Sequence, residues 1–243
     1  MSVYFLILIA VVIFICIALN NISAKVGVPV LLAFILLGMA FGNNGLFPVR
    51  INDYESVENI CSIALIFIMF YGGFGTSWSA AKCVSVEAGL LASLGVFLTA
   101  GVTGVLCHFL LHWGWLESLL LGSVLSSTDA ASVFSILRSK RLGLKNNSAP
   151  MLEVESGSND PCSYMLTVVM LSLMQTSVSA GHVAWMVFSQ IVFGAVFGVG
   201  IAFGAKYLLR RITFSPGFDS MFIFAVAVFS YAIPQIVGGN GYL

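Results

Sequence analysis

The sequence predicts an all-α, polytopic membrane protein, and three observations support this fold class. Of the 243 residues, 59% are hydrophobic and 8% are charged, and the mean hydropathy is +1.04. Soluble domains carry about 25% charged residues, so this composition excludes an ordinary soluble fold. The apolar residues form continuous runs, each long enough for a helix that crosses a bilayer. These runs lack the period-two alternation of membrane β-strands, which excludes a β-barrel.

Eight spans follow when each crossing requires roughly 20 mostly apolar residues. They are expected near residues 3–20, 28–42, 57–75, 84–111, 117–137, 150–177, 183–209 and 218–237. The first run lacks the basic start and the small-residue cleavage site of a signal peptide, so we expect a retained span. Pro29, Gly38 and Gly42 indicate that the second span is short, closely packed and open to a break.

The basic residues predict the orientation of these spans. Nine of the ten Lys and Arg residues lie in or beside alternate connections: Lys25, Lys82, Arg138, Lys140, Arg141, Lys145, Lys206, Arg210 and Arg211. Only Arg50 falls on the opposite side. The positive-inside rule then places the N-terminus outside and the connection 138–149 inside. We expect a multi-pass protein of the cell (inner) membrane, and the zero net charge gives no indication of nucleic acid binding.

Acidic residues interrupt two adjacent apolar runs. Asp129 stands in SSTDAAS of the fifth run, and Glu155 and Asp160 stand in ESGSNDP of the sixth. An ionisable group inside a membrane costs several kcal/mol and usually faces protein or water. Asp129 and Asp160 lie about ten residues inside their spans, which is near mid-bilayer at about 1.5 Å per residue. These two acids are predicted to be functional, whereas Glu153 is equally well explained as an acid at the cytoplasmic interface.

The spacing in the sixth run predicts an oxygen-rich cluster. Ser156 and Asp160 are four residues apart and share one helix face, while Glu155 and Asn159 form a neighbouring stripe. Pro161 disfavours helical geometry at Asp160 and frees one backbone carbonyl in the preceding turn. Hard cations take oxygen ligands, so a carboxylate, a hydroxyl and a loosened carbonyl suit sodium or potassium.

The fifth run offers two alternatives. Ser, Thr and Asp in SSTDAAS compete for backbone hydrogen bonds and favour helix ends. If the helix opens there, Asp129 would face the positive end of a half-helix, an arrangement that recurs near the midplane of transporters. The alternative is an intact polar helix that hydrogen-bonds to the sixth span.

Together, TDAAS and ESGSNDP resemble the paired signatures of monovalent cation/proton antiporters. The sequence is most similar to the NhaP-like branch, and within it to bacterial potassium/proton antiporters, over the whole chain in span order. That branch carries Thr-Asp at an unwound crossing and Glu-Ser-x-x-Asn-Asp on the next helix. The matching residues here are Thr128, Asp129, Glu155, Ser156, Asn159 and Asp160.

The resemblance implies a secondary active antiporter, not an enzyme, that exchanges a potassium or sodium ion for a proton. Such proteins work as homodimers in the lipid bilayer, with no cofactor and no metal beyond the transported cation. The ion- and proton-binding residues it implies are Asp160, Asn159, Asp129, Thr128 and Ser156. It also implies that Glu155 is a structural support that pairs with an arginine of a later helix.

The implied fold is the inverted-repeat cation/proton antiporter fold, with the first repeat and part of the second. Residues 1–177 would be the first repeat of six transmembrane helices, 178–213 a connecting helix, and 214–243 the start of the second repeat. Because the chain stops at VGGNGYL, we expect a truncated fragment in which Glu155 lacks its arginine partner. Many relatives carry an acid in the third span, where this chain has Tyr71.

Three alternatives to antiport stay open at this point. Two aspartates in adjacent spans also suit an intramembrane aspartyl protease, whose chemistry needs two carboxylates that share a proton. Such proteases carry GxGD, whereas this chain has SGSND. The second alternative is a channel or a passive binding module, and the third is a truncated fragment that does not transport.

A stripe of small residues in the seventh span predicts close helix contact. It consists of Gly194, Gly198, Ala202 and Ala205. The sequence leaves open whether this contact lies within one subunit or between two subunits.

Overall fold

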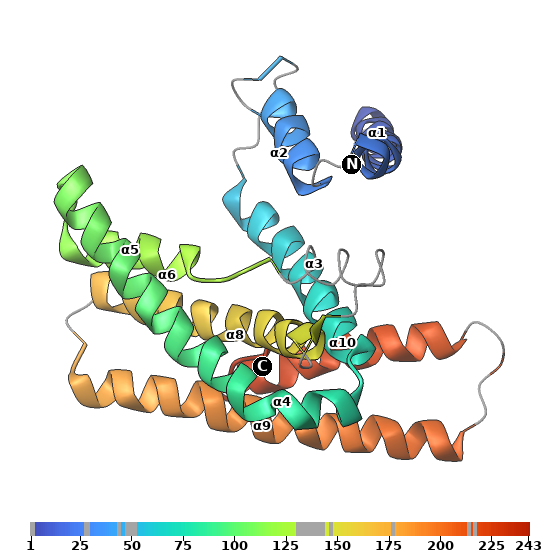
Figure 1. Cartoon of the computed structure of the whole chain (residues 1–243). Coiled ribbons are helices and arrows are strands. Elements are labelled where there is room, and N and C mark those ends of the chain that lie inside the picture. Colours follow the sequence, from blue (N-terminus) through green and yellow to red (C-terminus); the bar gives the residue numbers. More distant parts are fainter. Residues whose placement is uncertain are drawn as a thin grey trace. The chain divides into compact units, whose positions relative to one another are not determined.

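The computed structural model of the chain is drawn in Figure 1. It describes residues 3–26, 30–42, 45–46, 53–129, 144–145, 148–175, 178–212, 215 and 218–243. The chain divides into two units, Met1–Cys61 and Ser62–Leu243. Within the described ranges all regular secondary structure is helical, which confirms the predicted all-α class.

The first unit holds α1 (Val3–Val26) and α2 (Val30–Phe41), which pack against each other. It also holds the start of α3 (Tyr54–Gly75). Asp53 caps this helix, because one carboxylate oxygen accepts the backbone N–H of Ser56 at 3.1 Å and the other accepts its hydroxyl. These two bonds hold the pKa of Asp53 below its ordinary value.

In the second unit a continuous helical run corresponds to the predicted fourth span. It consists of α4 (Trp78–Leu90), the single π-helical turn η1 (Leu91–Gly95) and α5 (Val96–Leu111). Helix α5 packs closely against α6 (Trp115–Leu125). A Cβ on Gly104 would lie 2.8 Å from the Leu119 side chain, and one on Gly122 would strike the carbonyl of Ala100. Glycine at these two positions therefore lets the helix backbones touch.

The remaining helices are α8 (Ser148–Gln175), α9 (Ala180–Arg211) and α10 (Phe218–Ile236). Helix α8 packs against α4, η1, α6 and α9, so it lies at the centre of the contacts within this unit. Figure 1 shows α9 and α10 side by side, with the C-terminus near α8.

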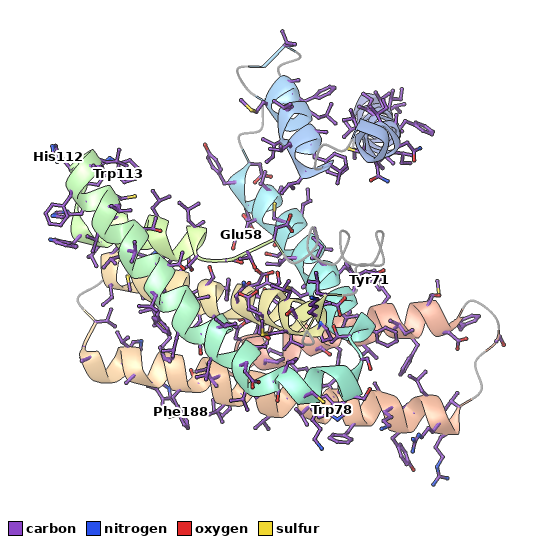
Figure 2. All side chains as sticks on the ribbon, in the orientation of Figure 1. Glu58, Tyr71, Trp78, His112, Trp113 and Phe188 are labelled. Atoms are coloured by element: carbon purple, nitrogen blue, oxygen red, sulfur yellow. The ribbon has the colours of Figure 1, made fainter. Side chains whose placement is uncertain are left out.

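Four described segments are long and apolar enough to cross a membrane: Tyr54–Gly75, Ala81–Leu111, Ala180–Arg211 and Phe218–Ile236. Shorter apolar helices occur at Ile9–Ile22, Val30–Phe41 and Trp115–Leu125. Large apolar side chains lie on exposed surfaces, such as Trp78 on α4 and Phe188 on α9 in Figure 2. These features fit a membrane protein, while the count of eight spans stays a prediction.

Two local predictions need correction. The helix expected over 117–137 ends at Leu125, and residues 126–129 are not helical, so the opened alternative is confirmed up to Asp129. Residues 130–143, which include most of the basic connection, lie outside the described part. The expected loss of helical geometry at Asp160 is wrong, because α8 continues through Pro161. Neighbouring groups, described below, support the backbone at this proline, as is common for prolines in membrane helices.

Candidate functional site

The site lies where the end of α6 meets the middle of α8. The last turn of α6 is fixed first, since the carbonyl of Ser123 accepts the hydroxyl of Ser126 at 2.7 Å. The same carbonyl accepts the hydroxyl of Ser163 on α8 at 2.6 Å. The backbone N–H of Ser126 reaches this carbonyl at 3.4 Å, so the two serine hydroxyls add shorter bonds to a carbonyl that the ending helix bonds only weakly. The chain after Ser126 is thereby held against α8.

Thr128 then bonds directly to α8. Its hydroxyl lies 3.0 Å from the hydroxyl of Ser156 and accepts the side-chain amide of Asn159 at 2.6 Å. Ser156 and Asn159 are almost fully buried, at 0% and 1% exposure. Residues 28 to 31 positions apart in sequence therefore meet in a protected polar cluster, as the paired motifs predict.

Asp160 also contacts the non-helical segment after α6, residues 126–129. Its carboxylate accepts a hydrogen bond from the hydroxyl of Ser127. Ser127 was not among the predicted site residues, although it stands within SSTDAAS beside Thr128. Its proximity to the motif was the only available signal, because a hydroxyl in a polar run has no distinctive spacing.

The side-chain amide of Asn159 forms hydrogen bonds through its nitrogen and not through its oxygen among the described residues. Its amide nitrogen donates to Thr128 and, at 3.0 Å, to a carboxylate oxygen of Glu155. An ionised carboxylate only accepts, so Glu155 requires the nitrogen on its side and fixes the orientation of the amide. The opposite atom, Oδ1, is buried and has no hydrogen-bond partner among the described residues. Native proteins rarely leave such an atom unsatisfied, so we expect a polar group that these residues do not supply to face it.

Glu155 has a partner of its own in the described part of the chain. The sequence predicts that its arginine partner is absent, whereas the structure gives it the amide of Asn159. Glu155 and Thr128 also line a cavity of about 180 Å³, together with Ser126, Thr99 and the π-helical turn η1. Single π-turns inside α-helices are often found at functional sites. The cavity therefore borders the polar cluster at Thr128 and Glu155.

Asp129 directly follows Thr128 and is the last described residue of the non-helical segment. The structure thus joins Thr128, Glu155, Ser156 and Asn159 in one hydrogen-bonded network, and it holds Asp160 from Ser127. Hydroxyl and carboxylate oxygens converge here, a donor set that suits a hard cation.

Comparison with known proteins now adds to this geometry. Residues 9–243 match the family described as "Sodium/hydrogen exchanger, transmembrane". The chain belongs to this exchanger family. The exchanger chain is therefore a membrane protein of a transporter family, and its all-α fold is that of the family's transmembrane part.

Several relatives have names that specify ions. The exchanger chain is 36% identical over 239 residues to a protein named K(+)/H(+) antiporter NhaP from Alkalimonas amylolytica, covering 98% of this chain and 42% of that protein. It is 32% identical over 231 residues to K(+)/H(+) antiporter NhaP2 of Shewanella sp. (strain ANA-3), covering 93% and 39%. It is 27% identical over 199 residues to Probable Na(+)/H(+) antiporter 2 of Methanocaldococcus jannaschii, covering 80% and 46%. The chain spans about two fifths of the length of these relatives.

Proposed function

We propose that the protein, as part of its complete gene product, exchanges potassium or sodium ions for protons across the cell (inner) membrane. Family membership and the names of the relatives support this class of secondary active transport. The observation that carries the proposal for this chain is the buried network that joins Thr128 to Ser156 and Asn159, with Asp160 bonded to Ser127 and Oδ1 of Asn159 without a partner among the described residues. A dehydrated cation bound at this cluster would satisfy such an oxygen.

In this mechanism Asp160 binds a cation or a proton, but not both. The cation would take oxygens from Asp160, Asn159, Thr128 and Ser156, and the proton would neutralise Asp160 when the cation has left. Competition for one carboxylate couples the two fluxes without a separate device. The neutral amide of Asn159 and the phenol of Tyr71 add no second acid, so the proposal includes one cation for one proton. Asp129 would contribute its carboxylate to the ion site from the non-helical segment after α6. Glu155 holds the amide of Asn159 in place.

The domain arrangement is part of the proposal. Residues 1–177 would form the first inverted repeat, 178–213 the connecting helix and 214–243 the start of the second repeat. The single long helix α9, with 32 residues from Ala180 to Arg211, supports the central assignment. We also propose an external N-terminus, on the charge distribution of the sequence, and a homodimer, on the resemblance alone.

A proton-gradient-driven exchange assay on the complete gene product in lipid vesicles tests this function. An imposed pH gradient should drive uptake of potassium or sodium, and an outward cation gradient should drive protons in the opposite direction. Cation flux that needs no counter-ion would identify a channel instead. Absence of flux together with cleavage of a membrane peptide would support the aspartyl protease.

A further inference from the structure

The C-terminal turn, residues 237–243, contacts α8 directly after Asp160. The side-chain amide of Asn240 donates a hydrogen bond to the carbonyl of Pro161 at 3.0 Å, and both residues are buried. One turn further along α8, the ring of Tyr242 packs edge-on against the ring of Tyr164 with centroids 4.9 Å apart. Two contacts from a segment 79 residues away in sequence thus bracket the helical turn that follows Asp160.

Asn240 is itself fixed by two further bonds. Its backbone N–H donates to the carbonyl of Gln190 on α9 at 3.0 Å. Its side-chain oxygen accepts the backbone N–H of Tyr242 at 2.9 Å. A backbone N–H can only donate, so this bond sets the orientation of the amide and directs its nitrogen at Pro161. Asn240 is 3% exposed, and both ends of its side chain are bonded.

Glycines bring the C-terminal turn into backbone contact with α9. A Cβ on Gly239 would lie 2.9 Å from the backbone nitrogen of Gly194, and a Cβ on Gly194 would lie 2.7 Å from the carbonyl oxygen of Asn240. Side chains at either position would push the turn away from α9. For Gly194, the first member of the small-residue stripe, the close contact therefore lies within one chain. The turn is an anchored part of the fold on which α8 can rest.

The bond from Asn240 reaches α8 at Pro161, directly after Asp160, and this position suggests its role. Proline has no N–H, so the helix lacks one hydrogen bond where Pro161 follows Asp160, and such positions bend more easily. A carbonyl has two acceptor positions, so Pro161 can accept Asn240 in addition to a helical N–H. We infer that Asn240 is a positioning residue, which holds the Asp160 turn of α8 in the geometry that binds the cation. This inference rests on the proposed function of Asp160.

The test compares three variants of the complete gene product in lipid vesicles. Asn240→Ala removes the bond to Pro161, and Asn240→Asp keeps the size of the side chain and the acceptor for Tyr242 but loses the donor. Ser189→Ala is the matched control, because the hydroxyl of Ser189 donates to the carbonyl of Gly238 at 3.1 Å and so ties the same turn to α9. For each variant we measure the cation concentration that gives half-maximal exchange, the maximal exchange rate and the thermal unfolding temperature.

Both Asn240 variants should raise the half-maximal cation concentration about five- to tenfold, the effect of one lost buried hydrogen bond. Their maximal rate should stay within about twofold of the wild-type rate. Ser189→Ala should lower the unfolding temperature without changing the half-maximal concentration. Unchanged cation dependence in either folded Asn240 variant, or loss of folding in both, would assign Asn240 a purely structural role and overturn the inference. If Asp160→Asn retains normal exchange, the proposed function fails instead, whatever the Asn240 variants show.

Discussion

Replacement of Asn159 by alanine tests the hydrogen-bonded network quantitatively. The change removes a neutral bond to Thr128 and a charge-assisted bond to Glu155. Such bonds contribute about 1 and about 1.5–3 kcal/mol to stability, respectively. The change also removes Oδ1, a buried atom without a partner among the described residues, and relieves a penalty of about 1–3 kcal/mol. The cation-free protein should therefore lose only about 1–2 kcal/mol.

The same substitution should have a larger effect when the cation is present. A ligand at about 100 times its dissociation constant stabilises the folded state by about 2.7 kcal/mol. About 2–4 °C per kcal/mol applies to domains of about 150–250 residues and the shift falls with length, so the unfolding temperature of the longer wild-type gene product should rise by a few degrees. Asn159→Ala removes one proposed ligand and frees Thr128 and Glu155, so it should lose at least half of this rise.

Thermal unfolding of the complete gene product in detergent measures both the stability of the cation-free protein and the rise in unfolding temperature on cation binding. Potassium or sodium chloride is titrated at constant ionic strength, with choline chloride as the replacement salt. Ser163→Ala is the control, because it removes one buried bond to Ser123 that lies outside the proposed ligand set. The control should lower the unfolding temperature by a few degrees and keep the full cation-dependent rise. A full rise in Asn159→Ala would refute the assignment of Asn159 as a ligand.

Three other predictions concern topology, charge movement and pH. On a background without the five native cysteines, Lys145→Cys should react with an impermeant thiol reagent only from the cytoplasmic side, and reaction from outside would reverse the orientation. Exchange in vesicles clamped at different membrane potentials should proceed at a constant rate, whereas a steep dependence on potential would exclude one cation for one proton. The lowered pKa of Asp53 means that its cap stabilises α3 at pH values above the pKa of the unfolded chain and is lost as the pH falls through the folded-state pKa. Hydrogen exchange at the start of α3 should therefore accelerate only below about pH 4, and Asp53→Asn should remove that dependence.

The polar cluster could be predicted because its geometry is largely local. Residues four apart on α8 share a face, so the motif itself places Glu155 beside Asn159, and the structure confirms this contact. The opened end of α6 was one of two alternatives, since Ser, Thr and Asp weaken a helix without fixing where it stops. The break after Leu125 coincides with the bonds of Ser126 and Ser163 to the carbonyl of Ser123, and the bond of Ser163 comes from another helix, α8.

Other features depend on contacts that leave no local pattern. Pro161 predicted a disturbed helix, but α8 is continuous through it, and Asn240 donates a hydrogen bond to the carbonyl of Pro161. Asn240 stands in a glycine-rich turn and shows no periodic relation to α8, so its bond to Pro161 appears only in the fold. The π-helical turn at Leu91–Gly95 has an ordinary helical sequence, LASLG, and its single additional residue per turn cannot be read from composition.

The most direct test of the account is cation/proton exchange by Asp160→Asn in the complete gene product, reconstituted in lipid vesicles. The substitution keeps the size of the side chain and an acceptor for the hydroxyl of Ser127, but it removes the only group in the proposed mechanism that alternates between cation and proton. We expect a folded protein with an unfolding temperature close to that of the wild type and no exchange above that of empty vesicles. Exchange at the wild-type rate would show that Asp160 is not the coupling carboxylate and would contradict the proposed site.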